Sequence, residues 1–100
     1  MLKNAFVPLQ ITNKFNPRHL LKQLPKSAFK QTELTNFNKM MFIVNQILVL
    51  PKNITTIPSQ MFFFKTYEPI IDTVIAPYLQ EIDDFAFDQQ HSLQFVYAPQ

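Results

Sequence analysis

The sequence predicts a mainly α-helical protein with two principal amphipathic helices, at about residues 33–50 and 66–83. Apolar residues recur in steps of three and four from Leu34 to Leu48, and again from Tyr67 to Ile82. This is the spacing of residues on one face of a helix. Pro51 falls where the first helix would end, because proline cannot continue a helix. A small α+β domain is the alternative fold class.

The N-terminal region predicts an extended arm followed by a short helix. Residues 1–15 mix apolar and polar side chains without helical spacing, so we expect an extended arm there. Asn16 and Pro17 then suit a helix start. Asparagine can cap free N–H groups, and proline is tolerated in the first turn, where its missing donor is not needed.

The run from Met40 to Val44 contains five apolar residues in succession. A helix with this composition needs to be buried on more than one side. A pair of buried strands is the competing interpretation of the same run, because a short apolar stretch does not distinguish a buried strand from a buried helix.

The second predicted helix contains a proline at position 77, on its polar side. We therefore expect this helix to be kinked there, or to be split into two short helices. Short extended segments are predicted at residues 60–65, which include three consecutive phenylalanines, and at 92–97, where apolar and polar residues alternate.

The composition excludes several classes of site. A chain of 100 residues predicts one small domain over residues 1–100, and we find no internal repeat. Without cysteine there is no disulfide framework or zinc ribbon, and without glycine there is no glycine-rich phosphate loop or nucleophile elbow. We therefore predict that the protein is not an enzyme, and that it has no catalytic residue, cofactor, metal site or small-molecule substrate.

Charge is distributed unevenly along the chain. Residues 1–32 contain six Lys or Arg and no acidic residue, whereas residues 68–100 contain six acidic residues and no Lys or Arg. Basic side chains recur every four residues through the N-terminal region, which predicts a stripe that binds an acidic partner, phosphate, RNA or anionic lipid headgroups. The predicted basic stripe consists of Lys14, Arg18, Lys22, Lys26 and Lys30.

The amount of apolar surface indicates protein partners. Hydrophobic residues make up 47% of the chain and charged residues only 16%, against about 25% in typical soluble domains. We expect a non-catalytic accessory or structural subunit of a large multi-protein assembly, a mitochondrial complex of the respiratory-chain or ATP synthase type. The expected protein-interaction residues are Phe37, Met40, Met41, Phe42, Phe62, Phe63 and Phe64.

The mitochondrial location rests on the basic, acid-free N-terminus, and membrane association would come through the complex. Two alternatives stay open. One is an RNA-binding protein of a mitochondrial ribosome. The other is a single-pass membrane subunit, although the apolar run before Lys52 is shorter than the roughly 20 residues that a membrane span needs.

Overall fold

The computed structural model of the protein describes residues 17–64 and 70–98. In this part of the chain there is one short α-helix, α1, followed by two 3-10 helices, η1 and η2, and then by six short strands. The bounds are α1 Pro17–Leu21, η1 Lys26–Lys30, η2 Lys39–Phe42, β1 Ile43–Val44, β2 Ile47–Val49, β3 Thr56–Ile57, β4 Thr73–Ile75, β5 Glu81–Ile82 and β6 Phe95–Tyr97.

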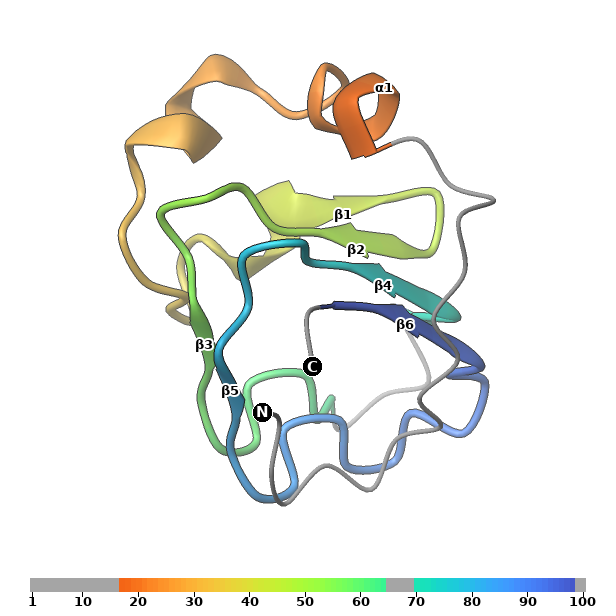
Figure 1. Ribbon diagram of the computed structural model, residues 1–100. Coiled ribbons are helices and arrows are strands. Elements are labelled where there is room, and N and C mark those ends of the chain that lie inside the picture. The colour runs from red at the N-terminus through yellow and green to blue at the C-terminus, as the bar shows by residue number, and fades with distance from the viewer. Residues whose placement is uncertain (1–16, 65–69, 99–100) are drawn as a thin grey trace.

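The strands form two sheets (Figure 1). The larger sheet has the order β1-β2-β4-β6, and the smaller one pairs β3 with β5. Strands β2, β4 and β6 are parallel, and β3 and β5 are parallel to each other, whereas β1 is antiparallel to β2. Figure 1 shows the strands of the larger sheet one below another. Strands β3 and β5 lie side by side at the left of the view, where the chain runs away from the larger sheet.

The parallel strands arise because the chain winds in successive coils. From β2 it runs to β3 and then returns to β4, beside β2; from β4 it runs to β5 and returns to β6. We call residues 47–64 and 70–72 coil 1 and residues 73–94 coil 2. The register pairs Ile47 with Thr73 and Thr73 with Phe95, so the repeat lengths are 26 and 22 residues. A chain that stacks similar coils in this way is a solenoid, in which each coil contacts mainly its neighbours.

Corresponding positions in the two coils share burial and backbone conformation. Ile57 and Ile82 pair in register, and both are buried. Gln60 and Phe85, each three residues further on, both have positive φ, at 57° and 59°. Each of the three parallel strands of the larger sheet, β2, β4 and β6, is followed by the same two-residue pattern of an apolar residue and proline: Leu50-Pro51, Ala76-Pro77 and, in sequence, Ala98-Pro99.

The sequence shows no internal repeat, whereas the structure repeats the arrangement of its strands and turns. The repeat is difficult to see in the sequence because the coils differ in length and because matched positions carry different residues, such as Gln60 and Phe85. What is repeated is the pattern of buried positions and turns, and that pattern becomes clear only when the strand register is known.

The core lies between the two sheets and is built from matched positions of successive coils. Leu48, Val74 and Val96 are aligned across three strands and are fully buried. The rings of Phe62 and Phe87 stack with centroids 5.5 Å apart and an angle of 11° between their planes. Aromatic contacts of this kind add about 0.5–1.5 kcal/mol beyond the burial of area, so they help to hold one coil on the next.

The larger sheet is buried on both faces at its centre. In β4 all three residues are buried, although successive side chains of a strand point to opposite faces. Parallel sheets usually have both faces covered and read as continuous apolar runs. This explains why the sequence around Thr73–Ile75 lacks the alternation that would have identified a strand.

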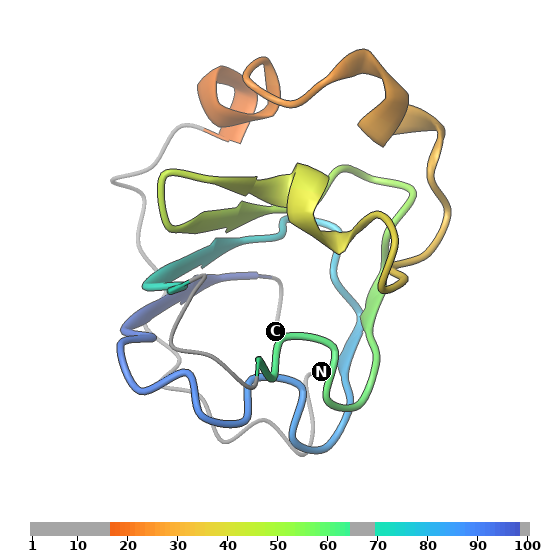
Figure 2. The same cartoon turned by 180° about the vertical axis from the view of Figure 1, so that it is seen from behind.

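A hairpin and the N-terminal segments cover the β1 end of the stack (Figure 2). Strands β1 and β2 are joined by Asn45 and Gln46, which have φ of 49° and 70°. Two successive residues with positive φ are the requirement of a type I′ turn, the two-residue turn that matches the twist of paired strands. Above the hairpin, Leu20 and Leu21 of α1 pack against the core, and Leu24 is buried within it.

The mainly α prediction is contradicted, because the described residues form an α/β fold with mixed sheets. The predicted helix at 33–50 is instead a turn, η2 and the β1–β2 hairpin. Its apolar spacing does not mark one face, since Phe37 is fully exposed while Phe42 and Leu48 are fully buried. The competing interpretation of a strand pair is confirmed for residues 43–49, although β1 is only partly buried and Leu48 and Val49 of β2 carry the burial.

The predicted helix at 66–83 is also wrong. Its described part contains β4, a turn and β5. Pro77 does not kink a helix but lies in the turn after β4, where its missing N–H is not needed for strand pairing. Helical spacing appeared because a buried strand and a buried corner follow each other closely.

Two shorter predictions are confirmed, and others are not. A helix does begin at Pro17, and β6 lies within the extended segment predicted at 92–97. The segment predicted at 60–65 contains no strand in its described part, residues 60–64. The predicted arm at 1–15 lies outside the described residues.

Within the described ranges, no helix has the length and apolar character that crossing a membrane requires.

The hairpin makes a prediction about Gln46. Because glycine adopts positive φ without a steric cost, Gln46→Gly should raise the free energy of unfolding by about 0.5 kcal/mol. If residues 33–50 were helical, the same substitution would lower it by about 1 kcal/mol. Urea denaturation followed by circular dichroism measures the sign. Gln23→Gly is the matched control, because this exposed glutamine does not have positive φ, and it should lower stability.

Candidate protein-interaction surface

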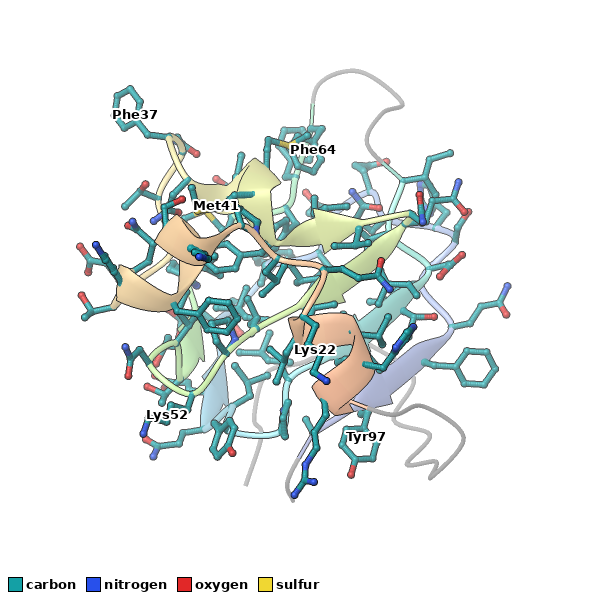
Figure 3. The ribbon with its side chains drawn as sticks, turned by 90° about the horizontal axis from the view of Figure 1, so that it is seen from above. Lys22, Phe37, Met41, Lys52, Phe64 and Tyr97 are labelled. Carbon is teal, nitrogen blue, oxygen red and sulfur yellow. The ribbon has the colours of Figure 1, made fainter. Side chains whose placement is uncertain are left out.

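Five large apolar side chains are exposed in the described part of the chain. Phe37 stands out, because its side chain is 100% exposed. In Figure 3 its ring points away from the body of the molecule, on the side opposite Lys22 and Tyr97. The others are Phe29, Met40, Tyr78 and Phe85, which are between 42% and 57% exposed.

The residues predicted for protein interaction divide into three groups. Phe37 and Met40 are exposed, at 100% and 51%. Met41, Phe63 and Phe64 are partly buried. Phe42 and Phe62 are fully buried in the core, where they are needed for packing and do not reach a partner. Composition alone could not separate these groups, because all seven are large and apolar.

The turn that carries Phe37 is fixed by hydrogen bonds from Thr35 and Asn38. The Thr35 hydroxyl oxygen accepts hydrogen bonds from the backbone N–H groups of Phe37 and Asn38, both at 3.2 Å. In return, the Asn38 Oδ1 accepts a hydrogen bond from the Thr35 N–H at 2.8 Å. Threonine and asparagine side chains commonly stabilise turns by such local bonds. The backbone at Phe37 is therefore set by its immediate neighbours.

Asn38 also attaches the turn to the segment before it. Its side chain is buried, and its Nδ2 donates to the Gln31 Oε1 at 3.0 Å and to the Glu33 backbone oxygen at 2.9 Å. A buried amide that makes several hydrogen bonds is expensive to remove, because its partners would be left unpaired. Asn38 thus acts as the internal support of an exposed phenylalanine.

Lys39 attaches the other side of the turn to coil 1. Its Nζ donates to the Met61 backbone oxygen at 2.9 Å and to the Asn36 Oδ1 at 3.2 Å, and lies 4.5 Å from the centre of the Phe64 ring. Partial burial removes water from the ammonium and lowers the pKa of Lys39 below its usual value. The unfolded chain then keeps this proton to higher pH than the folded protein, so the Lys39 contribution to stability rises with pH through that interval.

The predicted basic stripe is only partly a single feature. Arg18 and Lys22 lie in α1 and just after it, whereas Lys26 and Lys30 lie in η1, and all four are exposed. Because α1 ends at Leu21, no continuous helix aligns them at four-residue spacing. Lys14 lies outside the described residues. Whether these side chains meet protein, RNA or lipid stays a prediction.

The described residues separate charge along the stack of coils. Residues 17–64 contain six Lys or Arg and one acidic residue, Glu33. Residues 70–98 contain no Lys or Arg, and their acidic residues lie just before β4, in β5 and in the turns after it. These acidic residues are Asp72, Glu81, Asp83, Asp84 and Asp88.

Sequence reasoning missed Phe29, Tyr78 and Phe85. Phe85 is the clearest case, because it occupies a corner of coil 2 with positive φ and is 57% exposed. The corner is attached to coil 1 by a hydrogen bond of 2.8 Å that the Ser59 hydroxyl donates to the Asp84 backbone oxygen. Its match with Gln60 in coil 1 identifies Phe85 as a corner position, but that match is found only from the strand register.

The chain was compared with known proteins. Comparison with protein-family models, with curated proteins and with solved structures found no match. Metal chemistry has no support in the described ranges either, since they hold no group of three His, Asp or Glu arranged to bind an ion.

The hydrogen bonds of the Phe37 turn predict that alanine substitutions of Asn38 and Asn36 differ in their effect on the free energy of unfolding. Asn38→Ala removes three hydrogen bonds of a buried side chain and should lower the free energy of unfolding by about 2 kcal/mol. Asn36→Ala removes only the acceptor of one exposed bond and should change it by less than about 0.5 kcal/mol. Chemical denaturation of both variants measures the difference. Equal effects would show that the turn is not built as described.

Proposed function

We propose that this protein is a non-catalytic, protein-binding solenoid that serves as a subunit of a larger protein assembly. The observation that carries the proposal is Phe37, which is fully exposed on a turn that hydrogen bonds of Thr35 and Asn38 hold in place. A large apolar side chain in water gains free energy only when a partner covers it, and aromatic residues are frequent anchors in protein interfaces.

The architecture supports the same proposal. Repeat solenoids present extended surfaces and commonly act by binding other proteins. The coils of 26 and 22 residues fall in the range of leucine-rich repeats, whose buried positions follow the pattern L-x-x-L-x-L. Buried apolar residues occur at that spacing twice, around β4 and around β6: Ile71, Val74 and Ala76, then Leu93, Val96 and Ala98.

The likeness to that pattern is incomplete. The next consensus position is an asparagine or cysteine, but coil 2 has the buried Leu79 there. In coil 1 the position is Asn53, which is exposed and whose Nδ2 donates to the Phe29 backbone oxygen at 3.1 Å. We therefore use the pattern as support for a protein-binding solenoid and not as an assignment to a class of repeats.

The mitochondrial complex, the RNA-binding alternative and the membrane-subunit alternative remain predictions from sequence. Exposed Arg18, Lys22, Lys26 and Lys30 are compatible with an acidic protein, RNA or anionic lipid. We favour an acidic protein, because three of the five exposed apolar side chains, Phe29, Phe37 and Met40, lie in the same basic part of the chain, residues 17–64.

The proposal predicts the size of the native particle. Purified under native conditions from its own cells, the protein should elute well above the 11.8 kDa of one chain, with other proteins in fixed stoichiometry. Ribonuclease treatment should leave the particle intact, whereas an RNA-binding protein would be released. A stable monomer at micromolar concentration, with no stoichiometric partner, would contradict the proposal.

A further inference from the structure

We infer that the outer edge of β6 is a strand-binding surface, and that residues 2–8 of the same chain occupy it as one more parallel strand. Strand β6 is the last strand of the larger sheet (Figure 1). Two independent observations carry the inference. One is the buried backbone of Val96, and the other is a sequence pattern of the parallel strands that recurs at residues 2–8.

The backbone of Val96 points away from the rest of the sheet. Hydrogen bonds between β4 and β6 use the residues on either side of it. The Phe95 N–H donates to the Asp72 oxygen at 3.3 Å, and the Tyr97 oxygen accepts from the Ala76 N–H at 2.8 Å. Because alternate residues of a paired strand direct their N–H and C=O groups to opposite edges, those of Val96 face the outer edge of β6.

These backbone groups are buried without a partner. Val96 is 0% exposed, and its N–H and C=O groups have no hydrogen-bond partner among the described residues, where β6 has only β4 beside it. Buried backbone groups in native proteins are almost always paired, and leaving one unpaired costs about 1–3 kcal/mol. The edge of β6 therefore needs both a donor and an acceptor, which a further strand supplies.

Residues 2–8 repeat the sequence pattern of the parallel strands. Around β4 and β6, an apolar residue is followed three and five positions later by two more apolar residues, and then directly by proline. The same spacing occurs once more near the N-terminus. The residues are Ile71, Val74, Ala76 and Pro77 around β4, Leu93, Val96, Ala98 and Pro99 around β6, and Leu2, Ala5, Val7 and Pro8 in the arm.

The proline of the pattern marks where pairing stops. The Leu50 N–H donates to the Ile75 oxygen at 2.9 Å, and the next donor from β4 would be residue 77. That residue is proline, which has no N–H. Aligning the patterns puts Pro8 at the same step of the ladder, so the arm has the strand length that this fold uses.

The same alignment satisfies both backbone groups of Val96. With Ala5 opposite Val96, the Val96 N–H donates to the Asn4 oxygen and the Val96 oxygen accepts from the Phe6 N–H, which is how Val74 is placed against β6. An unpaired edge is a template for pairing with other chains, and solenoids need caps at their ends. Residues 2–8 thus act as a cap on the β6 end of the stack.

The arm is long enough to reach the β6 of its own chain. Eight residues, 9–16, connect Pro8 with α1, and they span up to about 26 Å when extended. The helix α1 contacts β2, and the proposed strand lies three strand spacings from β2, about 14 Å. A short tether holds the arm at an effective concentration of about 1 mM, which favours its own β6 over that of a second copy.

Disulfide trapping in the full chain tests the inference, because the sequence has no cysteine. In the proposed register residues 6 and 97 lie opposite each other, within the reach of a disulfide. On mild oxidation, Phe6→Cys with Tyr97→Cys should form an intramolecular disulfide in several-fold higher yield than Phe6→Cys with Ile43→Cys. Ile43 is the control because it lies in β1, at the other end of the sheet. Equal yields, or mainly disulfide-linked dimers, would overturn the inference.

Amide hydrogen exchange gives the second measurement. Phe6→Pro removes the N–H that pairs with Val96, so exchange of the Val96 amide should become at least about tenfold faster while that of Val74 changes little. Gln10→Pro, which lies beyond the proposed strand, should leave both unchanged. No effect of Phe6→Pro on Val96, or the same effect of both variants, would contradict the inference. The proposed function is tested separately by copurification, so each can fail without the other.

Discussion

The structure depends on parallel pairing between successive coils. Strands of two or three residues have no stability of their own, so each parallel strand persists only because the neighbouring coil supplies hydrogen bonds and covers its apolar side chains. The backbone N–H of Leu50 donates to the Ile75 oxygen at 2.9 Å, and that of Ala76 donates to the Tyr97 oxygen at 2.8 Å. These two bonds extend the pairing to the residue before each proline, where it ends.

Side chains reinforce this pairing where the strands stop. The Oε1 of Gln90 accepts from the Ile71 N–H and its Nε2 donates to the Phe62 oxygen, both at 3.0 Å. One glutamine of coil 2 therefore holds two separate points of coil 1, next to the stacked rings of Phe62 and Phe87. The rigid coils in turn provide the base to which Lys39 attaches the turn of Phe37. The exposed Phe37 thus lies in the non-repeating N-terminal segments but takes its position from the repeat.

Sequence reasoning could identify what depends on local chemistry, and little else. Asn16-Pro17 marked the start of α1, and alternation around Phe95 marked β6. Helical spacing at 34–48 was misleading, because distinguishing the exposed Phe37 from the buried Phe42 requires the turn that Asn38 forms with Gln31 and Glu33. The repeat itself was hidden because parallel pairing joins residues 22 to 26 positions apart, beyond the reach of any local pattern.

Nuclear Overhauser effects between backbone protons test the stacked-coil account most directly. In isotope-labelled protein, parallel pairing predicts contacts from the amide proton of Leu50 to residues 74–75 and from the amide proton of Ala76 to residues 96–97. Adjacent strands lie about 4.8 Å apart, within the range of such effects. Medium-range contacts between residues three and four apart across 70–83, which are typical of a helix, would contradict the account if no contacts between the coils were observed.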